Sequence, residues 1–85
     1  MKILLNKNTE KTLNKLKKKN PVILQQVSKT IEEISKNPNS NKYEKVVKYP
    51  SYKRARSGKY RICFKTLDET TLYIARIAKR SKVYS

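Results

Sequence analysis

The sequence contains no histidine and only six acidic residues among 85. Histidine is the commonest general base at neutral pH and the commonest metal ligand. Its absence excludes catalysis by a histidine base and metal sites with histidine ligands. Glu32 and Glu33 are adjacent on a predicted helix and point apart, while Asp68 and Glu69 fall in a predicted turn. No group of carboxylates resembles a magnesium site. Any chemistry is therefore expected to need no metal or cofactor and to be carried by Arg, Lys and Tyr.

Cysteine and long apolar runs are also scarce. Cys63 is the only cysteine, which excludes an intramolecular disulfide and favours a reducing cytoplasm. No apolar run approaches the roughly 18 residues of a membrane span. The first residues hold an apolar run of three residues, whereas a signal-peptide core needs about 7–15. We expect a cytoplasmic protein that has no membrane partner.

Positive charge is what the sequence has in excess. It holds 22 Lys and Arg against 6 Asp and Glu, which gives a net charge of +16. Such a charge constrains partners rather than fold, and it favours nucleic acid over an anionic membrane or an acidic protein. The length allows one domain, spanning residues 1–85.

The first half of the chain predicts a strand and two helices. Residues 2–6 form a short apolar strand, and Asn8 or Thr9 is expected to cap a helix over 9–19. Asn20–Pro21 is a strong start for a second helix, because a capping side chain precedes a proline that needs no N–H. An apolar stripe with helical spacing follows, and Asn37–Pro38 ends the helix. The stripe is Leu24, Val27, Ile31 and Ile34.

The second half predicts strands. Residues 45–49 are a possible short strand or an approach segment, and three longer strands are expected at 52–57, 59–67 and 70–78. Gly58 and Asp68–Glu69 are the expected turns. The fold class is α+β, in the order β-α-α-β-β-β. A two-helix hairpin packs on one face of a small, mainly antiparallel, twisted sheet.

The stretch "YKRARSGKYR", residues 52–61, places five cations in ten positions around the only glycine. A turn at Gly58–Lys59 pairs Arg56 with Arg61, whereas a turn at Ser57–Gly58 pairs Arg54 with Arg61. Both registers give the same two faces. The cationic face holds Arg54, Arg56, Arg61, Cys63 and Lys65, and the core face holds Ala55, Tyr60, Ile62 and Phe64.

Opposed arginines in this hairpin destabilise the fold by up to about 1 kcal/mol per pair. Because Arg binds phosphate through a two-point fork, a polyanionic ligand explains the cluster better than a merely solvated face does. If Asp68–Glu69 is a two-residue turn, Arg61 lies opposite Arg76 and Tyr60 opposite Ile77. Arg76 then joins the cationic face. The residues expected in the core from this strand are Tyr73, Ala75 and Ile77.

The motifs "YKRARSGKYRICF" and "IARIAKRSKVYS" resemble the RelE/ParE superfamily of small toxins. That family shows a basic-x-basic strand, a glycine turn, Tyr-Arg with apolar alternation, then a basic turn and a Val-Tyr ending. The corresponding positions are Arg54, Arg56, Gly58, Tyr60–Arg61, Arg76–Ile77–Ala78, Lys79–Arg80 and Val83–Tyr84. The resemblance, including the preceding helical hairpin, covers nearly the whole chain.

The resemblance implies a toxin of a type II toxin–antitoxin system. RelE-type members cleave mRNA in the ribosomal A site, and we expect that activity here, without a metal and with attack by the RNA 2′-hydroxyl. A ParE-like inhibitor of DNA gyrase and a non-catalytic RNA- or ribosome-binding module are the alternatives. The implied partners are mRNA on the ribosome, with contacts to rRNA, and a cognate acidic antitoxin.

The expected catalytic residues follow the same resemblance. Arg61 and Arg80 are predicted phosphate clamps. Arg54 and Arg56 match paired basic positions and act as electrostatic groups, because a guanidinium stays protonated and is a poor base. Tyr84 is expected to stack on a base or transfer a proton, or else to pack on the sheet. The general base stays open.

The expected RNA-binding residues lie around this set. Lys48, Lys53 and Lys59 are predicted contacts to the RNA backbone at the rim. Arg76 is expected to support the site, to bind a partner or to act in catalysis. Lys79 is also expected to contact RNA, and several relatives carry a histidine at the matching position or near the chain end.

Overall fold

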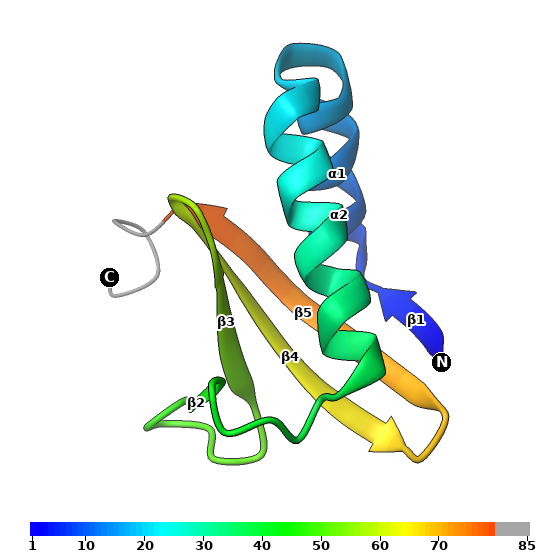
Figure 1. Cartoon of the computed structure of the whole chain (residues 1–85). Coiled ribbons are helices and arrows are strands. Elements are labelled where there is room, and N and C mark those ends of the chain that lie inside the picture. Colours follow the sequence, from blue (N-terminus) through cyan, green and yellow to red (C-terminus); the bar gives the residue numbers. More distant parts are fainter. Residues whose placement is uncertain (80–85) are drawn as a thin grey trace.

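The computed structural model describes residues 1–79, and its element order agrees with the predicted β-α-α-β-β-β, with the possible extra strand before the β-hairpin present as the two-residue β2 (Glu44–Lys45) (Figure 1). A two-helix hairpin follows the first strand, and the remaining strands come after it. The chain therefore has the α+β fold that the sequence predicts. The elements are β1 (Lys2–Leu5), α1 (Lys7–Lys19), α2 (Pro21–Lys36), β2 (Glu44–Lys45), β3 (Lys53–Ser57), β4 (Tyr60–Asp68) and β5 (Thr71–Lys79).

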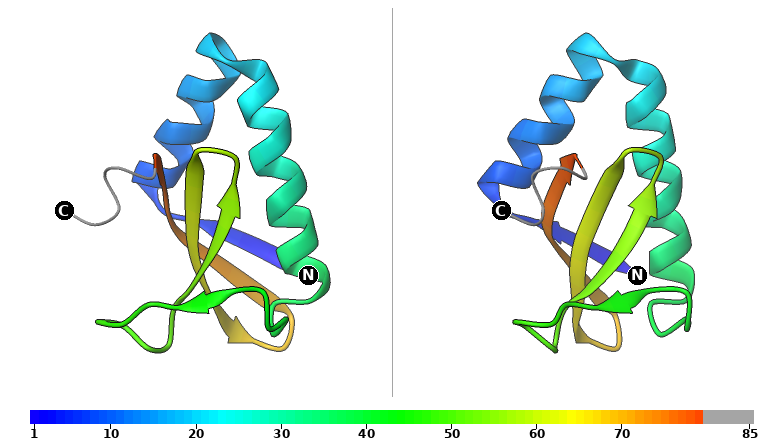
Figure 2. Two further views of the ribbon diagram at one scale, coloured as in Figure 1. Left: turned by 60° about the vertical axis from the view of Figure 1, so that its left-hand side comes forward. Right: turned by 90° about the vertical axis from the view of Figure 1, so that its left-hand side faces the viewer.

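The described strands form one mixed sheet in the order β1-β5-β4-β3-β2. β1 pairs with β5 in parallel, and the other neighbours are antiparallel. The two helices carry the chain from the edge strand β1 toward the opposite edge, and they cover one face of the sheet (Figures 1 and 2). Within residues 1–79, neither helix is long and apolar enough to cross a membrane.

Helix α1 begins earlier than the sequence predicts. Its N-cap is Asn6 rather than Asn8 or Thr9, and the Asn6 side chain accepts a hydrogen bond from the Thr9 N–H at 2.8 Å. The Asn6 amide also donates to the Ala75 carbonyl at 2.8 Å and to the Tyr73 hydroxyl at 3.1 Å. The helix starts at this residue because one side chain both caps it and ties it to β5.

Helix α2 begins and ends where the sequence predicts. Asn20 caps it, with its side chain accepting from the Ile23 N–H at 3.3 Å, and Pro21 is the first helical residue. Asn37 closes it by donating its N–H to the Glu33 and Ile34 carbonyls. Of the predicted stripe, three residues are buried and Leu24 lies half-buried at the margin.

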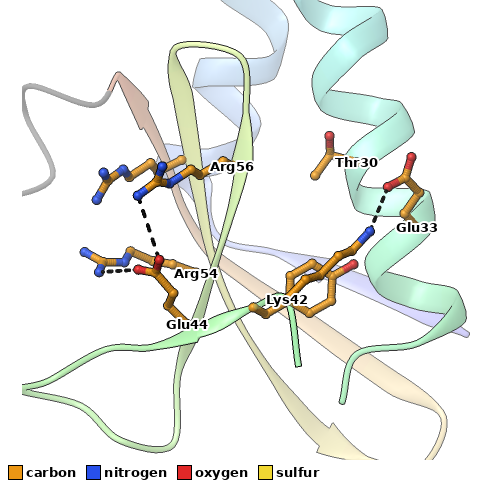
Figure 3. Close-up of a pocket in the computed structure, with 8 residues that line it drawn as sticks. Thr30, Glu33, Lys42, Glu44, Arg54 and Arg56 are labelled. Atoms are coloured by element: carbon orange, nitrogen blue, oxygen red, sulfur yellow. Dashed lines mark hydrogen bonds and ion pairs between the residues drawn. The ribbon is translucent and has the colours of Figure 1, made fainter. Parts of the chain in front are cut away.

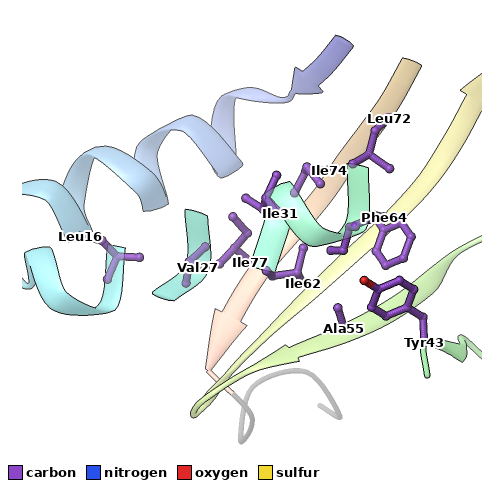
Figure 4. Close-up of a cluster of buried hydrophobic side chains, with 11 residues drawn as sticks. Leu16, Val27, Ile31, Tyr43, Ala55, Ile62, Phe64, Leu72, Ile74 and Ile77 are labelled. Carbon is purple, nitrogen blue, oxygen red and sulfur yellow. The ribbon is translucent and has the colours of Figure 1, made fainter. Parts of the chain in front are cut away.

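The core fills the space between the helices and the sheet (Figure 4). The ring of Tyr43 meets Phe64 edge to face, with centroids 5.3 Å apart. This contact fixes the segment that precedes β2 against the central strand β4. The buried apolar residues are Leu16, Val27, Ile31, Ile34, Tyr43, Ala55, Ile62, Phe64, Leu72, Ile74 and Ile77.

The β4–β5 turn differs from the predicted one. Asp68 pairs with Thr71, so the turn residues are Glu69 and Thr70. The Asp68 carboxylate accepts from the Thr70 N–H at 2.8 Å and from its hydroxyl at 3.0 Å. These hydrogen bonds, led by the backbone one, hold the pKa of Asp68 below its ordinary value. An aspartate that bonds two residues ahead defines an Asx turn, which favours this position.

The pairing of β4 with β5 also departs from the prediction. Cys63 pairs with Arg76 but Phe64 pairs with Ile74, so a bulge at Ala75 shifts the alternation of faces. The predicted pairs of Arg61 with Arg76 and of Tyr60 with Ile77 are therefore wrong. Arg61 lies opposite Ala78, and Tyr60 opposite Lys79.

The bulge also changes which β5 residues enter the core. Leu72, Ile74 and Ile77 are buried there, so the prediction holds for Ile77 but not for Tyr73 and Ala75. Arg76 still shares a face with its partner Cys63, as the sequence predicts, although by a different register.

Candidate functional site

The β3–β4 hairpin turns at Gly58–Lys59, which is the first of the two predicted registers. Ser57 pairs with Tyr60, and Arg56 pairs with Arg61. Gly58 has a φ of 59°, a left-handed conformation that side chains with a Cβ rarely adopt. The only glycine of the chain therefore fixes the register that places two arginines directly opposite each other.

The three arginines of this hairpin differ sharply in exposure. Arg61 is 3% exposed, whereas the side chains of Arg54 and Arg56 are 17% and 62% exposed. The sequence predicts a shared cationic face, and the register confirms it. Exposure to solvent therefore differs across this face: Arg61 lies inside the protein, whereas Arg56 reaches its surface.

A pocket of about 320 Å³ lies around strand β3, next to these arginines (Figure 3). Arg54, Arg56 and Glu44 gather on one side of the strand, and Thr30 with Glu33 lies on the α2 side. The pocket joins side chains from α2, the segment around β2, and the β3–β4 hairpin. Its lining residues are Thr30, Glu33, Lys42, Tyr43, Glu44, Arg54, Arg56 and Arg61.

Glu44 holds the only carboxylate on the arginine side of this pocket, among the described residues that line it. Strand β2 pairs with β3 so that Glu44 lies directly opposite Arg54. One carboxylate oxygen is 3.2 Å from an Arg54 guanidinium nitrogen, and the other is 3.8 Å from one of Arg56. Glu44 therefore bridges the two arginines and is oriented by both. We call Glu44, Arg54, Arg56 and Arg61 the arginine–glutamate cluster.

Glu44 is not among the site residues that the sequence predicts. The possible strand predicted at 45–49 begins one residue after β2 does, and no carboxylate pair marks the position. A usable signal was present, because Glu44 is the only acidic residue between Glu33 and Asp68. A single acidic residue just before the basic hairpin is expected to form an ion pair with one of the hairpin's cations.

The α2 side of the pocket carries a second ion pair and a buried tyrosine. Lys42 lies 3.4 Å from the Glu33 carboxylate, with both side chains largely exposed. Burial raises the pKa of Tyr43, against a lowering effect of Lys42 and with a smaller raising effect of Glu33. The Tyr43 hydroxyl thus stays protonated at neutral pH and serves as a wall of the pocket rather than as a base.

The other predicted site residues lie outside this pocket. Lys48 and Lys59 are exposed in loops, and Lys79 is exposed at the end of β5. Lys53 pairs with Phe64, so it belongs to the face of Ala55 rather than to that of Arg54.

Arg76 is exposed on β5, in register with Cys63 and, across β4, with Arg54. Arg80 and Tyr84 lie outside the described residues. Within residues 1–79, no three His, Cys, Asp or Glu side chains come together in a way that could hold a metal ion.

A helical hairpin on one face of a five-stranded sheet, with an arginine-rich hairpin beside it, is the arrangement that the resemblance to small RelE/ParE toxins implies. The family model of the ParE toxin of type II toxin–antitoxin systems matches residues 3–84. The chain belongs to this family, within the RelE/ParE toxin superfamily, and is the toxin of a type II system. No protein with a curated description matches it.

Solved structures share the fold over nearly the whole chain. The YoeB/ParE toxin from Agrobacterium tumefaciens superposes with a TM-score of 0.82 at 12% identity, covering 94% of this chain and 99% of its own. The RelBE2 toxin–antitoxin complex from Mycobacterium tuberculosis gives 0.74 at 26% identity, covering 93% and 96%. The RelB–RelE complex from Methanococcus jannaschii gives 0.68 at 26% identity, covering 96% and 95%.

Proposed function

We propose that this toxin is a ribosome-dependent endoribonuclease that cleaves mRNA in the A site by attack of the RNA's own 2′-hydroxyl. The observation that carries the proposal is the arginine–glutamate cluster, in which a carboxylate is ion-paired with the guanidinium groups of Arg54 and Arg56 beside a pocket that Arg61 also lines. The reaction needs a proton acceptor and a set of positive charges, and the cluster holds both.

Glu44 is the proton acceptor in this proposal. A carboxylate accepts hydrogen bonds and protons, whereas a guanidinium group stays protonated and does neither. Ion pairs with Arg54 and Arg56 fix the position of the carboxylate. Glu44 takes the proton of the 2′-hydroxyl as that oxygen forms its bond to phosphorus. The bond to the 5′-oxygen breaks as that oxygen takes up a proton, from Tyr84 or from water, and becomes the 5′-hydroxyl of the downstream fragment. A 2′,3′-cyclic phosphate remains on the upstream fragment.

Arg61 is the main stabiliser of charge on the phosphorane. Its burial places the guanidinium in a poorly solvated environment, where its interaction with an anion is stronger than in water. Arg56 lies opposite it and reaches the surface, where it meets the incoming phosphate. Arg80 remains a predicted second clamp, and Tyr84 a predicted proton donor to the leaving 5′-oxygen or a stacking residue.

The ends of the cleaved message test this chemistry. We expect a 2′,3′-cyclic or 3′ phosphate and a 5′-hydroxyl, because the nucleophile belongs to the RNA. Cleavage should persist in a chelator when ribosome integrity is controlled with a magnesium-buffered mock reaction. End-group mapping that finds 5′-phosphates would indicate attack by water, usually metal-bound, and would overturn this mechanism.

The match to the ParE toxin model favours a second function, inhibition of DNA gyrase. The same fold and the same type of partner would serve that activity. The cluster argues for the nuclease, because a gyrase inhibitor needs no carboxylate oriented between arginines. A non-catalytic RNA- or ribosome-binding module would likewise use the cations without Glu44.

The proposed partner in the cell is a cognate antitoxin with an acidic, amphipathic segment. The M. tuberculosis and M. jannaschii relatives are toxin–antitoxin complexes, and the net charge of +16 favours an acidic partner. Association should be fast and should weaken as salt is raised, because the attraction between the chains is screened. If an acidic protein encoded next to the toxin bound it with equal affinity at low and high salt in calorimetry, this role of charge would be contradicted.

A further inference from the structure

A second pocket, of about 370 Å³, lies on the sheet face that carries Arg54 and Cys63. Its walls come from two sources. The segment between β2 and β3 provides Val46, Tyr49 and Tyr52, and the strands provide Arg54, Cys63, Ala75 and Arg76. We call it the tyrosine pocket. The proposed catalytic function leaves it unused, although the two pockets share Arg54.

The backbone of the segment between β2 and β3 holds both tyrosines in place. The Val46 N–H donates to the Tyr52 carbonyl at 3.0 Å and closes the loop. Inside it, the Tyr49 N–H donates to Val46 at 3.2 Å and the Tyr52 N–H to Tyr49 at 2.9 Å. The two rings meet edge to face, with centroids 6.4 Å apart and an interplanar angle of 80°. Tyr49 is 63% exposed, so most of the residue is accessible to a ligand.

Cations surround these rings. The Lys65 ammonium lies over the Tyr52 ring, 4.8 Å from its centroid. Arg54 and Arg76 flank the pocket from β3 and β5, in register across Cys63. Of the described residues that line the pocket, none is acidic. Aromatic faces beside positive charges suit a ligand that joins a flat ring to an anion, as a nucleotide does.

We infer that the tyrosine pocket stacks the base of an mRNA nucleotide next to the cleaved phosphate. The inference rests on the proposed function and names a subsite of it. Because Arg54 lines both pockets, a single RNA strand can follow it from the arginine–glutamate cluster to the tyrosines. Tyr49 supplies the accessible ring, and Arg76 contacts the phosphate of the stacked nucleotide. This assignment gives Arg76 a part in RNA binding rather than in catalysis.

The test measures binding separately from cleavage. Ribosomes are programmed with a message whose A-site codon and next nucleotide are 2′-O-methylated, which removes the nucleophile. A single abasic nucleotide is then placed at each of these four positions in turn, and the affinity of the toxin is measured. One position should weaken binding by about tenfold, because stacking of one base on an aromatic side chain has an effect of that order.

Variants at Tyr49 identify the stacking partner. Tyr49→Leu should bind the intact message about tenfold more weakly than the wild type and should no longer respond to the abasic nucleotide. Tyr49→Phe keeps the ring and should behave like the wild type. Val47→Ala is the matched control, since Val47 is 94% exposed in the same loop and does not line the pocket. Thermal midpoints of all four proteins establish that each is folded.

Several results would overturn the inference while leaving the proposed function intact. One is that every abasic message binds as tightly as the intact one. Another is that Tyr49→Leu still distinguishes the abasic message. A third is that Tyr49→Leu weakens binding of the antitoxin alone, which would make the pocket a protein-binding surface. If the wild-type toxin does not bind programmed ribosomes at all, the proposed function fails together with the inference.

Discussion

Replacing Glu44 by glutamine should lower message cleavage by about two to four orders of magnitude, the usual contribution of a general base. Glutamine keeps the shape of the side chain, and its carbonyl oxygen can still accept from Arg54. It cannot take a proton from the 2′-hydroxyl. Because Glu44 is more than half exposed, the loss of its ion pairs should change the thermal midpoint little. The measurement is single-turnover cleavage on programmed ribosomes.

Glu32→Gln is the matched control for this experiment. Glu32 forms an exposed ion pair with Lys36 along α2, at 3.7 Å, and does not line the pocket. The Glu32→Gln variant should cleave the message at the wild-type rate. The general-base role of Glu44 would be contradicted if Glu44→Gln cleaved within a few fold of the wild type, or if both glutamine variants lost the same activity.

Replacing Arg61 should separate catalysis from folding. Loss of one preorganised charge donor is worth about 3–4 kcal/mol in the transition state, which corresponds to a hundred- to a thousandfold in rate. Arg61→Met removes the charge but keeps most of the buried stem. It also relieves repulsion from the opposed Arg56, which offsets part of the favourable interaction that the guanidinium loses, so the variant should stay folded with a thermal midpoint near that of the wild type. Arg61→Ala should lose the same activity and should have a lower thermal midpoint than Arg61→Met, because the buried stem is removed as well.

Two further variants serve as comparisons for Arg61→Met. Arg80→Ala is expected to lose activity similarly, on the sequence resemblance alone. Lys19→Ala, at the exposed end of α1, should change neither activity nor stability. If Arg61→Met cleaves normally, or if it is inactive only because it is unfolded, the phosphate-clamp role of Arg61 is wrong.

Local sequence signals predict most of this fold. Asn20–Pro21 and Asn37 set the limits of α2 because capping and proline act within a few residues. Gly58 sets the β3–β4 register for the same reason, since only its backbone tolerates the turn. Local signals do not predict a helix limit that depends on a contact with residues far away in the sequence. Asn6 is the cap of α1 because it also bonds β5, and no pattern near residue 6 shows that.

For the candidate site too, the sequence predicts what depends on neighbouring residues and not what depends on packing between strands. Alternation along the hairpin predicts that Arg54, Arg56 and Arg61 share a face, and the register confirms it. The burial of Arg61 and the ion pairs of Glu44 depend on packing between β2, β3 and β4, which the sequence does not show. The bulge at Ala75 is likewise a product of the assembled sheet.

Cleavage of mRNA by the toxin is tested most directly by primer extension on a message translated in vitro with the purified protein, run beside a gyrase supercoiling assay on the same preparation. A ribosome-dependent nuclease should produce new 5′ ends within A-site codons, and only during translation. Supercoiling should be unchanged, and the new ends should be lost with Glu44→Gln. Inhibition of supercoiling with an intact message would contradict the nuclease function and would establish the gyrase-directed function instead.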